Sequence, residues 1–368
     1  MLHDAKGWPD LSQNERQILS LIRRRGPLPR AALAQATGVS PQAITNISRN
    51  LINQGFLAEE QVVRGKVGQP STPLALAPNG ALFLGLKIGR RLVELALVDF
   101  AGQIKLHRQE IYRHPTPERV LTFARQGIAT LLEAAPQADR IAGLGIAIPF
   151  RLWDWGAEMA AWHDIDLAAC LGGALPFPVF LENDASTACA AELIFGRTAL
   201  PRDFVHLYIA HFAGGGVVLD GRLRIGPRRN AGALGSMPVP GGRQLLDCAS
   251  VSVLEGRLGR SLPPDDSGWD VPAEIERAWI RESAGAMAFA AVSAVALLDV
   301  PAVVIDGAIP PAVRDRLVDA TRSAMAGLPA AGIDRPEIVS GSLGRSARIL
   351  GAAALPLAHF FEPGGALA

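Results

Sequence analysis

The sequence predicts an α/β body of two similar lobes that follows a small, mainly helical domain at the amino terminus. Apolar residues in the first 70 positions have helical spacing, strand and helix patterns alternate after Pro78, and one order of strands occurs twice. The chain has 368 residues, of which 49% are hydrophobic and 19% charged, enough for two or three domains with large cores. Disordered and fibrous classes are therefore excluded.

Two short helices are expected first. Between residues 14 and 24, Ile18, Leu21 and Ile22 have the spacing of one helical face. Residues 29–37 form the second helix, and a tight turn at residues 38–40 follows it.

A third helix is expected to begin at Ser40 and to end at Gly55. Ser40 is a favourable N-cap, and Pro41 stands in the first helical position, where its missing N–H costs nothing. One face of this helix is apolar, with Ile44, Ile47 and Leu51. The opposite face carries Gln42, Thr45, Asn46 and Arg49.

Charge also distinguishes this domain from the body. The first 70 residues contain nine Lys and Arg against five Asp and Glu, whereas the whole chain has a net charge of +1. Polar and basic side chains on the third helix suit the reading of base edges and the binding of phosphates. The pattern favours a helix-turn-helix over the alternative, a three-helix bundle with a solvated polar face.

Two strands are expected next, at residues 56–64 and 73–77, and the loop between them forms a wing. Arg64 and Lys66 on this wing are candidates for contacts to the DNA backbone or the minor groove, although a charged hairpin tip can also be merely solvated. The candidate DNA-binding residues are Ser40, Gln42, Thr45, Asn46, Arg49, Arg64 and Lys66.

The repeat in the body lies in its strands. Strands are expected at residues 81–88 and 92–98, and the plan returns at 204–210, followed by a loop of glycines 214–216 and a strand at 217–219. Two related α/β halves that face each other create a cleft, which is a common place for a small-molecule site.

Compartment is indicated by the cysteines and the longest apolar run. Cys170, Cys189 and Cys248 are widely spaced and odd in number, so neither a disulfide framework nor a zinc ribbon is expected, and the cytoplasm is the expected compartment. The apolar run at residues 284–298 is shorter than the roughly 20 residues of a membrane span, which predicts a buried helix.

Six segments together resemble the ROK family of repressors and sugar kinases. They are the amino-terminal helix-turn-helix, G-L-G-I-A-I-P (143–149), E-N-D-A-S (182–186), G-G-G-V-V-L-D-G-R-L (214–223), A-G-A-L-G-S-M-P-V (231–239) and S-L-G-R-S-A-R-I-L-G-A-A (342–353). The resemblance implies a duplicated actin-like, ribonuclease-H-type body preceded by a winged helix-turn-helix. The expected domains are residues 1–78, 79–183 completed by a helix at 355–368, and 184–354.

The resemblance also shows where this sequence departs from the kinases. The family's first phosphate loop has an Asp that serves magnesium, and here Lys87 stands in its place. In the second loop, residues 210–216, His211 and Phe212 replace small residues that let backbone amides approach phosphate. Asp184 matches the family's catalytic base, but phosphoryl transfer also needs held phosphates and metal. We therefore expect no kinase activity and no cofactor.

The family's zinc and sugar loop is altered as well. By resemblance, Ala233 replaces a Glu that touches sugar hydroxyls and Ser236 replaces a zinc-binding His. Gly241 and Leu245 fall at cysteine positions, and Asp247 falls at the final Glu. Zinc takes four N or S ligands, so no metal is expected, and the loop is expected to be held by apolar packing.

The combined interpretation is a cytoplasmic, ligand-responsive transcription regulator, most simply a repressor, that binds operator DNA as a homo-oligomer, dimer or tetramer. The effector is expected to be a sugar or sugar derivative. Candidate ligand contacts are Asn183, Asp184, Asp247, Ala233 and Ser236. Two alternatives remain: an ATP-dependent sugar kinase with degenerate phosphate loops, and a DNA-binding protein whose body is a ligand-free dimerisation scaffold.

Overall fold

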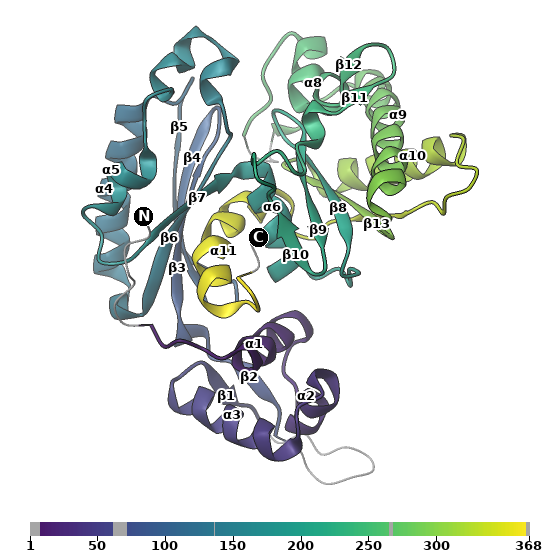
Figure 1. Cartoon of the computed structure of the whole chain (residues 1–368). Coiled ribbons are helices and arrows are strands. Elements are labelled where there is room, and N and C mark those ends of the chain that lie inside the picture. Colours follow the sequence, from purple (N-terminus) through teal and green to yellow (C-terminus); the bar gives the residue numbers. More distant parts are fainter. Residues whose placement is uncertain (1–7, 62–71, 136, 265–267, 366–368) are drawn as a thin grey trace. The chain divides into compact units, whose positions relative to one another are not determined.

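The computed structural model describes residues 8–61, 72–135, 137–264 and 268–365 (Figure 1). It separates into two compact units, Met1–Glu182 with Ala352–Ala366, and Asn183–Gly351. The amino-terminal domain is grouped with the first lobe in unit 1, whereas the sequence suggested a boundary at residue 78. Unit 2 contains the second lobe.

The amino-terminal domain has three helices and a two-stranded sheet: α1 (Gln13–Arg25), α2 (Arg30–Thr37), α3 (Pro41–Asn53), β1 (Leu57–Glu59) and β2 (Leu74–Leu76). The strands pair antiparallel, as expected for the base of a wing. A capping box between Ser12 and Glu15 begins α1, and Ser40 caps α3 with Pro41 behind it.

The buried faces of these helices differ slightly from those expected. On α3 the buried residues are Ile44, Ser48 and Leu51, while Ile47 is only half-buried. Ser48 tolerates burial because its hydroxyl donates a hydrogen bond of 2.6 Å to the carbonyl of Ile44. The helix-turn-helix arrangement itself is confirmed.

Unit 1 continues with a five-stranded sheet in the order β5-β4-β3-β6-β7. Its strands are β3 (Leu82–Ile88), β4 (Leu92–Asp99), β5 (Ile104–Ile111), β6 (Ile141–Ile148) and β7 (Val179–Asn183), with helices α4 (Pro117–Ala134) and α5 (Leu167–Gly172). These two helices lie on one face of the sheet and α11 (Ala347–Phe361) on the other (Figure 1).

Unit 2 repeats this plan with the order β10-β9-β8-β13-β14. The strands are β8 (Phe204–Ile209), β9 (Gly214–Leu219), β10 (Arg222–Arg224), β13 (Ala302–Gly307) and β14 (Glu337–Ser340). The helices are α6 (Asp184–Phe195), α7 (Leu246–Ala249), α8 (Val251–Leu258), α9 (Ala273–Leu298) and α10 (Pro311–Ala326). In both sheets the first strand forms an antiparallel hairpin with the next strand and pairs in parallel with a later one, which confirms the predicted duplication.

Glycines 214–216 belong to strand β9 and are not the loop that the sequence predicted. Helix α6 explains them. A Cβ on Gly214 would lie 2.7 Å from the Cβ of Ala185, and one on Gly216 would lie 2.5 Å from the Cβ of Cys189. The glycines therefore let α6 approach the strand, and their presence does not by itself indicate a phosphate loop.

Helix α9 is longer than the apolar run from which it was predicted. It has 26 residues, and by length and composition alone it could cross a membrane. Trp279, Met287 and Ala291 on this helix are nevertheless buried in the hydrophobic core of unit 2. We therefore describe α9 as a core helix.

Candidate DNA interface and ligand site

The outer face of α3 carries the candidate DNA-binding residues. Gln42, Asn46 and Arg49 are exposed. Two of the predicted residues have local roles as well, because the Ser40 hydroxyl accepts a hydrogen bond from the Ala43 amide and the Thr45 hydroxyl donates to the Pro41 carbonyl. Arg64 and Lys66 lie outside the described residues.

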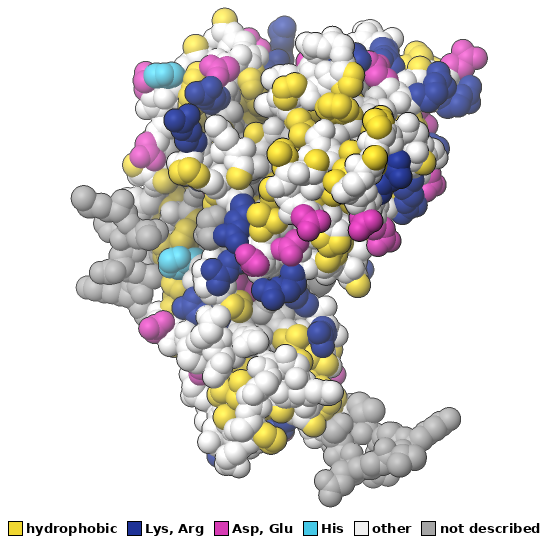
Figure 2. Space-filling view, turned by 45° about the vertical axis from the view of Figure 1, so that its right-hand side comes forward, with side chains coloured by type: hydrophobic (Ala, Val, Ile, Leu, Met, Phe, Trp, Pro, Cys, Tyr) yellow, Lys and Arg dark blue, Asp and Glu magenta, His cyan; other side chains and the backbone are white. Residues whose placement is uncertain are grey.

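Basic and acidic side chains are interspersed over the surface in Figure 2, in keeping with the net charge of +1. A net charge this close to zero provides no global field that would attract nucleic acid. DNA recognition would depend on the local polar face of α3.

The first candidate phosphate turn joins β3 and β4. Lys87 and Glu94 face each other across this hairpin, and the Lys87 Nζ lies 2.8 Å from the Glu94 Oε2, with both side chains almost fully buried. Beyond them, Arg90 contacts Glu158 at 3.3 Å. Cationic side chains of the chain itself therefore fill the place where the kinase pattern has a magnesium-binding Asp, and a magnesium ion does not fit this donor set.

The second candidate phosphate turn joins β8 and β9. Ala213 N–H donates a hydrogen bond of 2.8 Å to the Ser250 hydroxyl, which is buried, and the Ala210 carbonyl accepts from Val251 N–H. The His211 Nδ1 lies 3.3 Å from the Glu255 Oε2, an ion-pair distance without hydrogen-bond geometry. Backbone groups of this turn are thus tied to the start of α8.

Asn183 and Asp184 begin α6. The Asn183 Oδ1 accepts hydrogen bonds from the Ala185 and Ser186 amides, so this side chain caps the helix, whereas from the sequence it is named as a candidate ligand contact. The Asp184 Oδ2 pairs with the Arg348 guanidinium at 3.1 Å, and each side chain is about one-seventh exposed, at 14% and 15%. Sequence reasoning missed Arg348 as a partner, although it lies in the quoted 342–353 motif.

The loop at residues 230–250 brings three polar residues together. The Asp247 Oδ2 accepts a hydrogen bond from Gln244 N–H at 2.9 Å, and the Gln244 side chain donates to the Ser236 carbonyl at 3.2 Å. Ala233, Ser236 and Asp247 are exposed. These side chains are therefore accessible to a small molecule.

This loop and the start of α6 both approach Gly214. A Cβ on Gly235 would lie 2.0 Å from the Ala213 carbonyl oxygen and 3.5 Å from the Cα of Gly214, while Ala185 packs against the same glycine. The structure thus places the Ala233–Ser236 turn and the Asn183–Asp184 corner beside one strand end.

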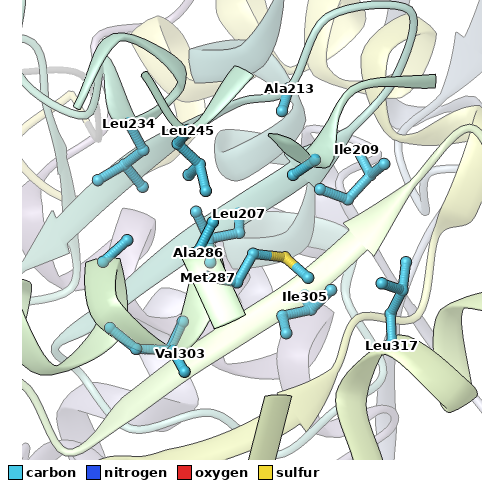
Figure 3. Close-up of a cluster of buried hydrophobic side chains, with 14 of the residues drawn as sticks. Leu207, Ile209, Ala213, Leu234, Leu245, Ala286, Met287, Val303, Ile305 and Leu317 are labelled. Atoms are coloured by element: carbon cyan, nitrogen blue, oxygen red, sulfur yellow. The ribbon is translucent and has the colours of Figure 1, made fainter. Parts of the chain in front are cut away.

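Apolar side chains hold the loop. Leu234, Val239 and Leu245 are buried in the core of unit 2, and Met237 and Leu246 pack against it. Figure 3 shows Leu234 and Leu245 among core side chains that include Leu207.

Zinc does not fit this loop. Leu245, which by resemblance stands where the family has a cysteine, is fully buried among apolar groups. The Cys248 thiol donates to the Gln244 carbonyl at 3.7 Å. Within the described ranges, no group of three or more His, Cys, Asp or Glu residues is arranged to hold a metal ion. The absence of zinc from the protein remains a prediction.

Comparison with known families agrees with this geometry. Residues 83–259 match the model of the ROK family, and residues 11–58 match that of winged helix-turn-helix DNA-binding domains. The chain therefore contains a ROK family domain preceded by a winged helix-turn-helix domain. The crystal structure of a ROK family transcriptional regulator, a homolog of E. coli MLC protein, has the same fold, with a TM-score of 0.66 at 22% identity over 95% of this chain and 96% of that one.

Relatives include an uncharacterized protein, a repressor and an enzyme. Protein y4fQ of Sinorhizobium fredii is 26% identical over 97% of this chain and 93% of its own length. The xylose repressor of Bacillus spizizenii is 23% identical over 61% of this chain and 60% of its own length. The bifunctional enzyme NanE/NanK of Brucella melitensis is 34% identical over 54% of this chain and 39% of its own length. The last two alignments span less than two thirds of those relatives, so a ROK domain alone does not separate regulator from kinase.

Proposed function

We propose that this ROK protein is a cytoplasmic transcriptional repressor that releases its operator when it binds a sugar or sugar derivative, and that it transfers no phosphate. One observation carries the proposal: both hairpin turns at which kinases would hold phosphate are occupied by contacts of the chain itself. The Lys87–Glu94 ion pair joins the two strands next to the first turn, and the hydrogen bond from Ala213 to Ser250 holds the second.

Loss of the phosphate-binding groups at these turns would have a direct chemical consequence. Phosphoryl transfer is catalysed almost entirely by positioning of phosphates and by electrostatic stabilisation through metal and donors. With Lys87 in place of a magnesium ligand, Asp184 has no held phosphate toward which to activate a hydroxyl. One of its carboxylate oxygens, Oδ2, is also engaged in the ion pair with Arg348 at 3.1 Å.

The remaining groups suit a ligand rich in hydroxyls. Carboxylate and amide groups of Asp184, Asn183 and Asp247, with Ser236, offer acceptors and donors for sugar hydroxyls, and Ala233 leaves room where the family has a Glu. The similarity to a xylose repressor supports a carbohydrate effector. A homo-oligomer would place two copies of α3 in successive major grooves of a palindromic operator.

DNA binding and effector response can be tested together. Duplex DNA selected from a random pool by the protein would be titrated in a fluorescence anisotropy assay, with and without free aldopentoses, aldohexoses, amino sugars and polyols. We expect specific binding, and a lower affinity with at least one carbohydrate. A protein that selects no DNA would refute the proposal, whereas DNA binding that no carbohydrate changes would favour the scaffold alternative.

A variant tests the recognition face. Arg49→Ala should weaken binding to the selected site by about 1–3 kcal/mol if its guanidinium reads a base or a phosphate. Arg25→Ala at the exposed end of α1 is the matched control and should change affinity much less. Equal affinity for Arg49→Ala and wild type would place the DNA interface elsewhere.

A further inference from the structure

Helix α11 contacts chemically important residues at both of its ends. Its first turn, with Arg348, belongs to unit 2, and its later turns, from Ala352, belong to unit 1. Arg348 pairs with Asp184 of the candidate ligand site, and Glu362, directly after the helix, pairs with Arg23 of the winged helix-turn-helix. One continuous helix thus joins residues of the ligand site to residues of the DNA-binding domain.

At its first end, α11 is fitted tightly to α6. Three residues beyond Arg348, a Cβ on Gly351 would lie 2.0 Å from the carbonyl oxygen of Thr187, which in turn stands three residues beyond Asp184. Residues three apart lie on the same helical face, so the ion pair and the close contact are two successive contacts of the same two helices. Any rearrangement of the ion pair therefore changes how the first turn of α11 packs against α6.

The Arg348 guanidinium also lies near an aromatic ring. Its carbon lies 5.5 Å from the centre of the Tyr208 ring, and the Tyr208 hydroxyl donates a hydrogen bond to the Gly344 carbonyl. Arg348 is consequently fixed by an anion and an aromatic face. A ligand that takes Asp184 would remove the first of these contacts.

The middle of α11 lies on the first sheet at Pro356. A Cβ on Gly143 would lie 2.8 Å from the Cβ of Pro356, and one on Gly145 would lie 1.8 Å from the Ala352 carbonyl oxygen. Proline removes the helix hydrogen bond to that carbonyl, and helices bend at such positions. The sheet therefore packs against α11 at the position where Pro356 removes a helix hydrogen bond.

At its far end, α11 anchors the DNA-binding domain. The Glu362 carboxylate accepts a hydrogen bond of 2.6 Å from the Ser20 hydroxyl and pairs with Arg23, and both charged side chains are only 2% exposed. Phe361 packs against Phe56 and Phe100, with ring centres 5.3 and 4.8 Å apart. Because this contact is buried and includes an ion pair, a displacement of the end of α11 also displaces α1.

We propose that the Arg348–Asp184 ion pair is a latch that holds α11 in the operator-binding position, and that the effector opens it by taking Asp184 as an acceptor for its hydroxyl groups. This inference rests on the proposed function and names its regulation. When Arg348 is released, the first turn of α11 loses its packing against α6 and shifts. The Glu362–Arg23 ion pair transmits this shift to α1. Arg348 is therefore a positioning residue, which acts on DNA binding through α11.

The test opens the latch without a ligand. Operator affinity of Arg348→Met would be measured in the absence of sugar, on DNA selected by the wild type. We expect the dissociation constant to rise about 5- to 150-fold, the usual range of allosteric coupling. Arg314→Met is the matched control, since Arg314 has the same 15% exposure and pairs with Asp306 in the same unit, but lies on α10. It should bind the operator as the wild type does.

Two further variants sharpen the result. The double variant Asp184→Arg with Arg348→Asp restores an ion pair in reverse and should regain sugar-free operator affinity. Glu362→Gln weakens the far junction and should lower operator affinity in the same direction, which keeps the test open if Arg348→Met does not fold. Hydrogen exchange of residues 13–25 should rise in Arg348→Met and stay unchanged in Arg314→Met.

The outcomes separate the latch from the function on which it rests. A folded Arg348→Met that binds the operator like the wild type, while sugar still releases the wild type, overturns the latch and leaves the repressor intact. Equal weakening by Arg314→Met also overturns it, because the effect would then be general destabilisation. A wild-type protein that selects no DNA overturns both.

Discussion

The two hairpin turns of the duplicated body are equivalent in the fold and differ in chemistry. At the β3–β4 hairpin of unit 1, a buried ion pair of Lys87 and Glu94 joins the two strands. In unit 2, a hydrogen bond from Ala213 N–H to the Ser250 hydroxyl holds the β8–β9 turn, and in the following strand Gly216 packs closely against Cys189. The two equivalent hairpins are thus held differently, by an ion pair in unit 1 and by a hydrogen bond and close packing in unit 2.

This difference sets how each turn responds to mutation. A buried ion pair is sensitive to the loss of one partner, because the other charge remains without full compensation. A steric contact is sensitive to added volume. We therefore expect unit 1 to be destabilised by loss of one partner of the ion pair, and unit 2 to be destabilised by added side-chain volume.

The largest effect is expected at the ion pair. Lys87→Met leaves Glu94 buried beside His107, and it should lower the free energy of unfolding by about 3–5 kcal/mol. Urea denaturation measures this change. The double variant Lys87→Met with Glu94→Leu should recover most of the loss, and a double variant as unstable as the single one would show that charge is not the cause.

A smaller effect is expected from volume in unit 2. Gly216→Ala puts a methyl group 2.5 Å from the Cβ of Cys189, and it should cost about 2 kcal/mol of unfolding free energy. Gly285→Ala on the exposed side of α9 has open space and should stabilise by up to about 1 kcal/mol. Equal stability of the two variants would argue against tight packing of α6 on β9.

The smallest effect concerns a buried histidine on β8. Burial lowers the pKa of His206 to about 4, and neither ring nitrogen has a hydrogen-bond partner among the described residues. The unfolded chain, with an ordinary histidine pKa near 6.5, binds more protons below that pH, so stability falls as the solution is acidified and the loss levels off near pH 4.

This pH dependence can be isolated with His206→Leu. Between pH 7.5 and 5.5 the wild type should lose about 1 kcal/mol more unfolding free energy than the variant, as measured by urea denaturation at each pH. Identical losses would show that His206 titrates normally in the folded state.

Local patterns in the sequence predicted the elements of this fold well. The caps at Ser40 and Pro41, the hairpins and the repeated strand order depend on neighbouring residues, and they appear in the structure. Glycines 214–216 were assigned to a loop because their packing partner, α6, is not a local feature.

The site was less predictable for the same reason. Lys87 and Glu94 are cross-strand neighbours in one hairpin, so their pairing could have been inferred from its register. Arg348 and Asp184 are 164 positions apart, and Glu362 and Arg23 are 339 apart. Only the folded chain brings such partners together.

The central claim is that this ROK protein senses a carbohydrate without phosphorylating it. The most direct test measures ADP formation from magnesium-ATP in the presence of the carbohydrate that releases the operator, with a ROK sugar kinase as positive control. We expect no carbohydrate-dependent ADP formation, and operator release that is the same with and without ATP. Carbohydrate-dependent ADP formation by the purified protein would contradict it.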